Sequence, residues 1–145
     1  MNQALSKTEY ELLASFRYAL RRFLRFSEEA ARAAGMEPQQ HQALLAVKGF
    51  PGRDWVTISE LAERLQIRHH SAVGLVNRLV AQGLLARMPA MADRRQVHVT
   101  LTGQGATLLA QLSAVHKEEL WRLGPELSLL LARLNGESSA DQEVT

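Results

Sequence analysis

The spacing of the apolar residues changes at Gly83, and this change limits the folds that the chain can adopt. Before Gly83 the apolar residues recur about every 3.6 positions, as in amphipathic helices, whereas the segment QVHVTL at 96–101 alternates between polar and apolar residues. Its expected partner strand is LLARM at 84–88, and residues 89–95 form the connecting loop because a proline cannot continue the interior of a paired strand. We therefore predict a β-hairpin directly after a helix.

The helical region before the hairpin has a well-marked helix start at Thr57. The Thr57 hydroxyl can accept a hydrogen bond from the backbone N–H of Glu60, while the Glu60 side chain can reach back to the Thr57 N–H, which makes a capping box. Val56 and Leu61 stand at the two positions of a hydrophobic staple, a contact that fixes how the chain enters a helix. These residues predict a short helix in the segment TISELAERL at 57–65.

A tight turn at 66–68 leads into a second helix, from about Arg68 to Gln82. This helix has an apolar stripe, and Gly83 fits the left-handed position that commonly ends a helix. The stripe consists of Ala72, Leu75, Val76 and Leu79. Two short helices joined by a tight turn form the helix-turn-helix pattern, and a hairpin placed directly after them is a wing.

The helix-turn-helix and its wing belong to a module that we assign to residues 38–101. Pro38 suits the first turn of one more helix, because its missing N–H would have no partner there, and Gly49 ends that helix. We predict a fold that is mainly α with a small β-hairpin wing, and the whole chain, 1–145, is then a single winged-helix protein.

Longer helices are predicted on both sides of this module, at 7–34 and 103–134. Thr102 can cap the second of them, and we expect the dipeptide at 124–125, Gly-Pro, to interrupt it. Their Leu- and Phe-rich faces would be exposed in a single chain, which makes both of them candidate dimerisation helices. The tail at 136–145 is polar and acidic, so we expect it to be disordered.

The composition excludes several classes of protein. With 145 residues, of which 46% are hydrophobic, the chain can bury the core of one compact domain. It contains no cysteine, which rules out disulfides and thiolate metal sites. No segment approaches the roughly 20 apolar residues that span a bilayer, and the first ten residues lack the apolar core of a secretory signal. We expect a soluble, cytoplasmic protein.

Positive charge is concentrated in one part of the chain. Between Arg64 and Arg95 the sequence has six arginines and a single acidic residue, Asp93, whereas the net charge of the whole chain is only +2. Such clustering is typical of proteins that bind a polyanion.

No catalytic or metal-binding pattern stands out. The five histidines include no H-x-x-x-H pair, and adjacent histidines on a helix point about 100° apart, so we do not expect His69 and His70 to chelate a metal together. There is no glycine-rich phosphate loop and no nucleophile elbow. We expect neither an enzyme nor a bound cofactor.

The segment ADRRQVHVTLT, with Asp93, Arg95, Leu101 and Thr102, resembles the wing signature of the MarR family of bacterial transcription regulators. The segments TISELAERL and VNRLVAQGLL resemble the two helix-turn-helix halves of that family, and the likeness extends from about residue 8 to 134. The resemblance implies a homodimer, held together by the terminal helices, that binds a partly palindromic operator in double-stranded DNA, typically as a repressor. It also implies that a wing arginine enters or flanks the minor groove while the aspartate holds it by a salt bridge.

The face of the second helix opposite its apolar stripe is the expected DNA-reading surface. Polar side chains there can hydrogen-bond to base edges or phosphates, Val73 can touch a thymine methyl group, and arginines can neutralise phosphates. The two wing arginines, at 94 and 95, are equal candidates for the minor-groove contact. The expected DNA-binding residues are Arg68, His69, His70, Ser71, Val73, Gly74, Asn77, Arg78, Asp93, Arg94 and Arg95.

Gly74 is the least expected residue on the reading helix. Glycine in a helix costs about 1 kcal/mol relative to alanine and offers no side chain to a base, but it can allow the helix to approach the groove closely. With Gly74 in this position, we expect base recognition to depend mainly on the wing and on the segment His-His-Ser at 69–71.

Two questions stay open at the level of the sequence. The resemblance implies small aromatic or phenolic effectors, and aromatic candidates exist, although core packing or dimer contacts explain each of them better; they are Phe16, Phe23, His41 and Trp121. The alternatives are a regulator that acts without an effector and a winged-helix module that binds another protein instead of DNA.

Overall fold

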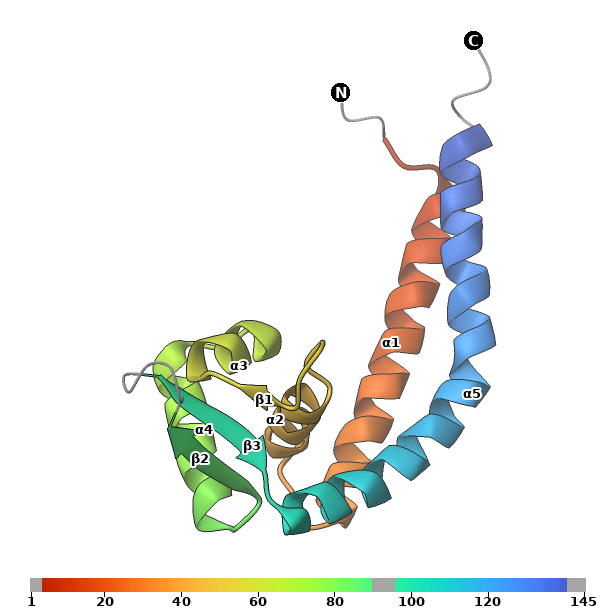
Figure 1. Cartoon of the computed structure of the whole chain (residues 1–145). Coiled ribbons are helices and arrows are strands. Elements are labelled where there is room, and N and C mark those ends of the chain that lie inside the picture. Colours follow the sequence, from red (N-terminus) through yellow and green to blue (C-terminus); the bar gives the residue numbers. More distant parts are fainter. Residues whose placement is uncertain (1–3, 90–95, 141–145) are drawn as a thin grey trace. The chain divides into compact units, whose positions relative to one another are not determined.

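The computed structural model describes residues 4–89 and 96–140, which divide into two compact units. One unit comprises residues 29–114, and the other combines residues 1–28 with residues 115–145. Helices α1 (Lys7–Ala33) and α5 (Gly103–Ala140) contribute to both units, and all other elements lie in the first (Figure 1). The predicted fold class, mainly α with a small β wing, is confirmed.

The unit of residues 29–114 contains three helices and a small antiparallel sheet. The helices are α2 (Pro38–Lys48), α3 (Ile58–Leu65) and α4 (His69–Ala81), and the strands are β1 (Trp55–Val56), β2 (Leu85–Pro89) and β3 (Val97–Leu101). The strand order is β1-β3-β2, so β3 is central (Figure 1). The predicted hairpin is therefore present, as the pair β2–β3.

Two features of the sheet differ from the sequence prediction. Strand β1 was not predicted, because a strand of two residues is too short to show a period of two. Pro89 is the last residue of β2, where it pairs with Val97, and does not begin the loop. Proline is tolerated there because β2 is an edge strand and Pro89 stands at its end, so no ladder bond in the interior of the sheet is lost.

The core of this unit forms where α2, α3, α4 and the sheet meet. Val56 and Leu61, the two predicted staple positions, are fully buried and belong to the same hydrophobic cluster. The apolar stripe of α4 is buried in that cluster with Val99 at the centre of β3. Burial of this stripe leaves the opposite side of α4 in contact with solvent.

The end of α4 has the geometry that its sequence predicts. Gly83 has a φ of +75°, in the left-handed region that glycine adopts without strain. The Leu84 N–H donates to the Leu79 carbonyl at 2.9 Å, and the Gly83 N–H donates to the Val80 carbonyl at 3.0 Å, which together make a Schellman motif. This motif directs the chain from α4 into β2.

The start of α5 is bonded to the end of α4. The Thr102 hydroxyl accepts from the Gly105 N–H at 3.0 Å, which confirms the predicted cap, and donates to the Gly83 carbonyl at 2.6 Å. The Thr102 N–H donates to the Leu84 carbonyl at 3.1 Å. Gly105 lies so close to this segment that an added Cβ would stand 2.1 Å from the Leu84 oxygen.

In the other unit the segments of α1 and α5 run side by side (Figure 1). A buried polar contact joins them, in which His116 Nε2 lies 2.8 Å from Ser27 Oγ. The rings of Phe23 and Phe26 meet the His116 ring edge-on, at centroid distances of 6.4 and 5.8 Å. The Phe23 ring thus packs against α5 within this unit.

Helix α5 is longer and more continuous than predicted. It passes through Gly124 and Pro125 without a break and ends at Ala140, so the predicted interruption is wrong. The missing Pro125 N–H leaves the carbonyl of Trp121 without a helical partner, and Trp121 lies on a solvent-exposed turn where water can bind that carbonyl. Residues 136–140, predicted to be disordered, are helical because extending an existing helix adds one hydrogen bond per residue.

Within residues 4–89 and 96–140, no helix combines the length and the apolar character that crossing a bilayer requires.

Replacing Gly105 by alanine should destabilise the protein strongly. The new methyl group would collide with a backbone oxygen, which cannot move aside as a flexible side chain can. We expect the free energy of unfolding to fall by about 3 kcal/mol, measured by urea denaturation. Gly103→Ala, two residues earlier in the same helix, is the control, because an added Cβ there meets no atom within 4 Å. Equal stability of the two variants would contradict the packing at Gly105.

Candidate nucleic-acid interface

The predicted capping box forms at the start of α3. The Glu60 N–H donates to the Thr57 hydroxyl at 3.2 Å, and the Thr57 N–H donates to Glu60 Oε1 at 2.9 Å. The second carboxylate oxygen, Oε2, accepts from the guanidinium of Arg53 in an ion pair that the sequence analysis did not predict. Both oxygens of Glu60 are therefore engaged, one by the helix cap and one by the segment that precedes it.

Two opposing effects act on the Glu60 carboxyl. Partial burial raises its pKa, and the hydrogen bonds from the backbone and hydroxyl of Thr57 and from Arg53, together with the Arg53 charge, lower it. The contributions that lower the pKa together exceed the effect of burial, so the pKa of Glu60 lies below its usual range. The carboxylate is consequently charged, and its contacts are intact, at neutral pH.

The predicted reading helix, α4, exposes the polar face that the sequence indicates. His69, His70 and Ser71 form its exposed first turn, and Asn77 and Arg78 are exposed further along. The half-buried Val73 and Gly74 lie between these two groups, and Arg68 stands exposed at the N-cap position. Arg68 gives α4 no side-chain cap, so the first backbone N–H groups of the helix can bind an anion.

Asn77 is bonded to the wing. Its side-chain oxygen accepts a hydrogen bond from the guanidinium of Arg87, which lies on β2. Arg87 is one of the six clustered arginines, but its position in the sequence predicts no partner, because the spacing of a strand and a helix does not reveal which of their side chains meet. This contact links the reading helix to the wing on the exposed side of the unit.

The fold does not require a glycine at position 74. An added Cβ would meet only Arg78 Nη1, at 3.5 Å, which is an ordinary van der Waals distance, and Gly74 lies in the middle of α4. At position 105, by contrast, glycine is required, because a Cβ atom there would collide with the backbone oxygen of Leu84. Packing within the described part of the chain therefore does not explain Gly74.

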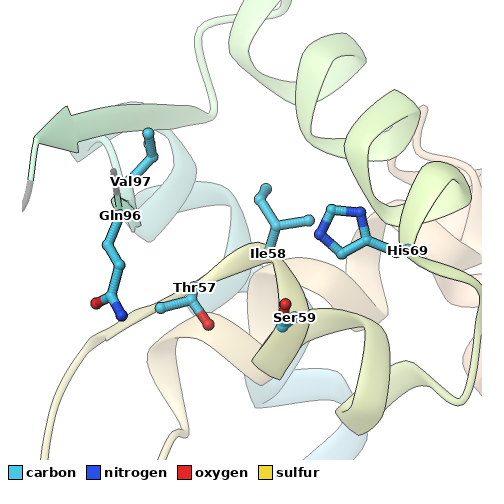
Figure 2. Close-up of a pocket in the computed structure, with 6 residues that line it drawn as sticks. All are labelled: Thr57, Ile58, Ser59, His69, Gln96 and Val97. Carbon is cyan, nitrogen blue, oxygen red and sulfur yellow. The ribbon is translucent and has the colours of Figure 1, made fainter. Parts of the chain in front are cut away.

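A cleft of about 380 Å³ opens beside the start of α4. It is bordered by the beginnings of α3, α4 and β3, and in Figure 2 His69 and Gln96 flank Ile58 and Ser59. Hydroxyl, imidazole and amide groups border it, all of which can donate hydrogen bonds to a phosphate oxygen. The lining residues are Thr57, Ile58, Ser59, His69, Gln96 and Val97.

The remaining predicted contacts divide into two groups. Asp93, Arg94 and Arg95 lie outside the described residues, so their roles stay predictions. Among the described arginines of the basic stretch, all four side chains are exposed, namely those of Arg64, Arg68, Arg78 and Arg87.

The four candidate effector residues are divided between the two units. Phe16 and Phe23 are half-buried and Trp121 is 72% exposed, all in the unit built from the two terminal segments. His41 is 2% exposed and belongs to the other unit. None of the four borders the cleft described above. Their role in binding an effector stays a prediction.

In the described part of the chain, no three His, Asp or Glu side chains gather closely enough to hold a metal ion.

Comparison with known proteins shows which family model and which solved structures this chain resembles. Residues 34–96 match the model of the MarR family. The whole chain is similar in structure to AbsC, a MarR family transcriptional regulator from Streptomyces coelicolor, with a TM-score of 0.73 and 18% identity over 97% of this chain and 99% of AbsC. A search of curated proteins found no match.

Two further similar structures involve ligands. A Staphylococcus aureus MepR mutant bound to an oligodeoxyribonucleotide matches with a TM-score of 0.63 and 20% identity, over 90% of this chain and 96% of MepR. BpsR of Bordetella bronchiseptica, studied for the regulation of its DNA binding by 6-hydroxynicotinic acid, matches with a TM-score of 0.63 and 22% identity, over 85% and 94% of the two chains. At these identities the likeness shows a shared fold.

The variant Glu60→Gln should lose stability at neutral pH but not in acid. Glutamine can still accept from the Thr57 N–H, so the substitution removes the charge and the ion pair with Arg53 while leaving the cap. Because the pKa of Glu60 is lowered in the folded state, its contribution is present above about pH 5 and is lost as the pH falls toward 3. We expect a deficit of about 0.5–1 kcal/mol at pH 7, measured by denaturant unfolding across this range.

Glu63→Gln is the control, since it removes the same charge from an exposed position of the same helix. If Glu60→Gln and the parent protein differ by the same amount at pH 3 and pH 7, the contacts of Glu60 do not depend on its charge.

Proposed function

We propose that this chain, whose residues 34–96 match the model of the MarR family, is a transcription regulator that binds double-stranded operator DNA as a homodimer in the cytoplasm. Each protomer presents α4 to a major groove and its wing to the adjacent minor groove. The exposed polar face of α4 carries this proposal, since its buried face already accounts for the packing of the helix. A major groove about 12 Å wide admits a helix in this way.

The first turn of α4 is well suited to phosphate and base contacts. His69, His70 and Ser71 are exposed, and the N-terminal end of the helix carries partial positive charge. The cleft beside this turn adds hydrogen-bond donors at a position where a DNA backbone would pass. Asn77 and Arg78 can then contact bases or phosphates further along the groove.

Electrostatic attraction supplies the non-specific part of the binding. The exposed arginines of α3, α4 and β2 have no acidic residue among their sequence neighbours from 64 to 89. Lysine and arginine side chains that neutralise phosphates release counterions, so affinity falls as salt rises. We expect the wing arginines, Arg94 and Arg95, to add to this term, with Asp93 orienting one of them.

The homodimer is supported by apolar surface on the terminal helices. Large hydrophobic side chains of α1 and α5 are exposed, and a soluble single chain rarely leaves so many uncovered. A second copy of the chain would cover them and would relate two reading helices by a two-fold axis, as a partly palindromic operator requires. The most exposed of these residues are Tyr10, Tyr18, Leu24, Trp121, Leu129 and Leu131.

We further propose that the protein acts as a repressor whose operator binding a small aromatic effector can release. The BpsR comparison concerns such regulation in a protein of the same fold. Phe16, Phe23, His41 and Trp121 stay the candidate residues for the effector.

Binding-site selection from random DNA tests the proposal directly. The purified protein should select half-sites whose centres lie about one helical turn apart, and light scattering should give twice the 16.2 kDa of the chain. The logarithm of its affinity should fall linearly with the logarithm of salt concentration. Arg95→Ala and Arg94→Ala should each be compared, and the larger loss identifies the residue in the minor groove. Weak binding that is independent of salt, or a monomer, would favour a protein-interaction module instead.

The variant Gly74→Ala separates folding from DNA binding. Alanine has the higher helix propensity and meets no close atom in this chain, so the free energy of unfolding should rise by about 1 kcal/mol. The same methyl group would stand between α4 and the groove, and we expect operator affinity to fall about tenfold, or about 1.4 kcal/mol. Both quantities can be measured on one protein preparation, by urea unfolding and by fluorescence anisotropy with labelled operator.

Gly136→Ala is the control, because Gly136 is also a helical glycine at which an added Cβ meets no close atom, but it lies on α5. If Gly74→Ala binds operator as tightly as Gly136→Ala, then α4 does not approach the groove at position 74.

A further inference from the structure

A stack of rings and a guanidinium links the wing to the segment that precedes α3. The imidazole of His98, on β3, lies on the indole of Trp55, on β1, with ring centroids 3.5 Å apart and planes inclined by 14°. The Arg53 Cζ atom lies 3.8 Å from the Trp55 ring centroid. Two groups this close to one centroid would collide if they shared a face, so the indole lies between His98 and Arg53.

The stack continues from Arg53 toward α3. The same Cζ atom lies 4.3 Å from the centroid of Phe50, so the guanidinium contacts two aromatic rings. The Arg64 Cζ atom lies 4.8 Å from the Phe50 ring as well, and Arg64 belongs to the last turn of α3. We call the set of His98, Trp55, Arg53 and Phe50 the Arg53 stack.

Arg53 also makes the ion pair with Glu60 in the first turn of α3. A single guanidinium therefore contacts two aromatic rings and a carboxylate at the same time, a combination that the compact ammonium group of lysine cannot reproduce. Its side chain is 25% exposed, and that of Glu60 is 28% exposed, so the pair is partly shielded from water. Shielding strengthens both the ion pair and the cation–π contacts.

We infer that Arg53 is a positioning residue for DNA binding, which holds wing strand β3 in place relative to the start of α3. It acts through Trp55 and His98 on the wing side and through Glu60 on the helix side. This inference rests on the proposed function and adds to it a residue that is not on the reading helix. The only backbone pairing between β3 and the segment before α3 is the short ladder with β1, in which Trp55 and Val56 pair with Thr100 and Val99. A ladder of two residue pairs is weak, so side-chain contacts are needed to keep the wing in one orientation.

The engagement of Arg53 distinguishes it from the arginines that we expect to bind phosphate. Its guanidinium already contacts both rings and the Glu60 carboxylate, so it is less available to a phosphate than the exposed arginines are. Loss of Arg53 should therefore weaken specific binding by disordering the wing, without reducing the number of counterions that DNA binding releases.

The first test needs no DNA. Hydrogen exchange of the wing amides should be measured in the full-length protein for Arg53→Met, which keeps an apolar side chain against the rings but loses the charge and the planar group. We expect the β3 amides to exchange about fivefold faster or more, while amides of α2 keep their rates. Val47→Ala, a core substitution in α2, is the control for general loss of stability, because Val47 is fully buried in the hydrophobic core and is not a member of the Arg53 stack. Equal acceleration of β3 exchange in both variants would overturn the inference.

The second test uses the selected operator. Arg53→Met should bind it about tenfold more weakly at a temperature where both variants are folded, with an unchanged slope of log affinity against log salt. Arg53→Lys should restore little of the loss, because it keeps the charge but not the planar contact. A slope reduced by about 0.9 would show instead that Arg53 contacts a phosphate. Unchanged affinity in Arg53→Met would overturn the inference while leaving the proposed function intact.

His98→Ala provides an independent check from the wing side of the stack. If Arg53 and His98 hold the wing through the same stack, the double variant Arg53→Met, His98→Ala should lose less affinity than the sum of the losses in the two single variants. Additive losses would show that the two residues act separately. Failure of the parent protein to bind any DNA would contradict the proposed function itself and, with it, any role of Arg53 in DNA binding.

Discussion

The Glu60 carboxylate is the interaction on which the arrangement of the winged module depends. One of its oxygens completes the cap of α3, and the other holds Arg53, whose guanidinium packs on Phe50 and Trp55. A helix start is ordinarily a local feature that leaves the preceding chain free to vary. Here the same carboxylate that accepts the hydrogen bond from the Thr57 N–H also holds, through Arg53, the segment that leads to the sheet. The direction of α3 and the position of β1 are set together.

At the other end of the module, a single side chain likewise makes two structural contacts. Thr102 caps α5 and, through the same hydroxyl, bonds to the Gly83 carbonyl at the end of α4. Because Gly105 has no side chain, the start of α5 can lie closer to the Leu84 carbonyl than any residue with a Cβ atom would allow. With α3 fixed at one end and the junction of α4 with α5 fixed at the other, the polar face of α4 is held outward on a rigid support. Rigid presentation of this kind reduces the ordering cost that binding would otherwise incur.

The two helix-associated glycines illustrate how structure and function can be separated in one chain. Gly105 is required by a neighbouring backbone oxygen, whereas an added Cβ at Gly74 would make only an ordinary contact with the Arg78 side chain, and Gly74 has a normal helical conformation. A sequence shows both as helix-weakening residues. Only the surroundings of each Cα reveal that one is explained by the fold and that the other needs an explanation from outside it, which the proposed approach of α4 to DNA supplies.

The sequence by itself determined the features whose causes are local. The capping box at Thr57, the turn at Gly83, the cap at Thr102 and the alternation of β3 each depend on residues within a few positions, and all were predicted. The tertiary structure alone decided the two-residue strand β1, the pairing of Pro89, the contact of Asn77 with Arg87, and the Arg53 stack. These depend on which distant segments come together, and period and composition carry no information on that. The continuity of α5 through Pro125 belongs to the same group, because whether a helix tolerates a lost hydrogen bond depends on the surroundings of the freed carbonyl.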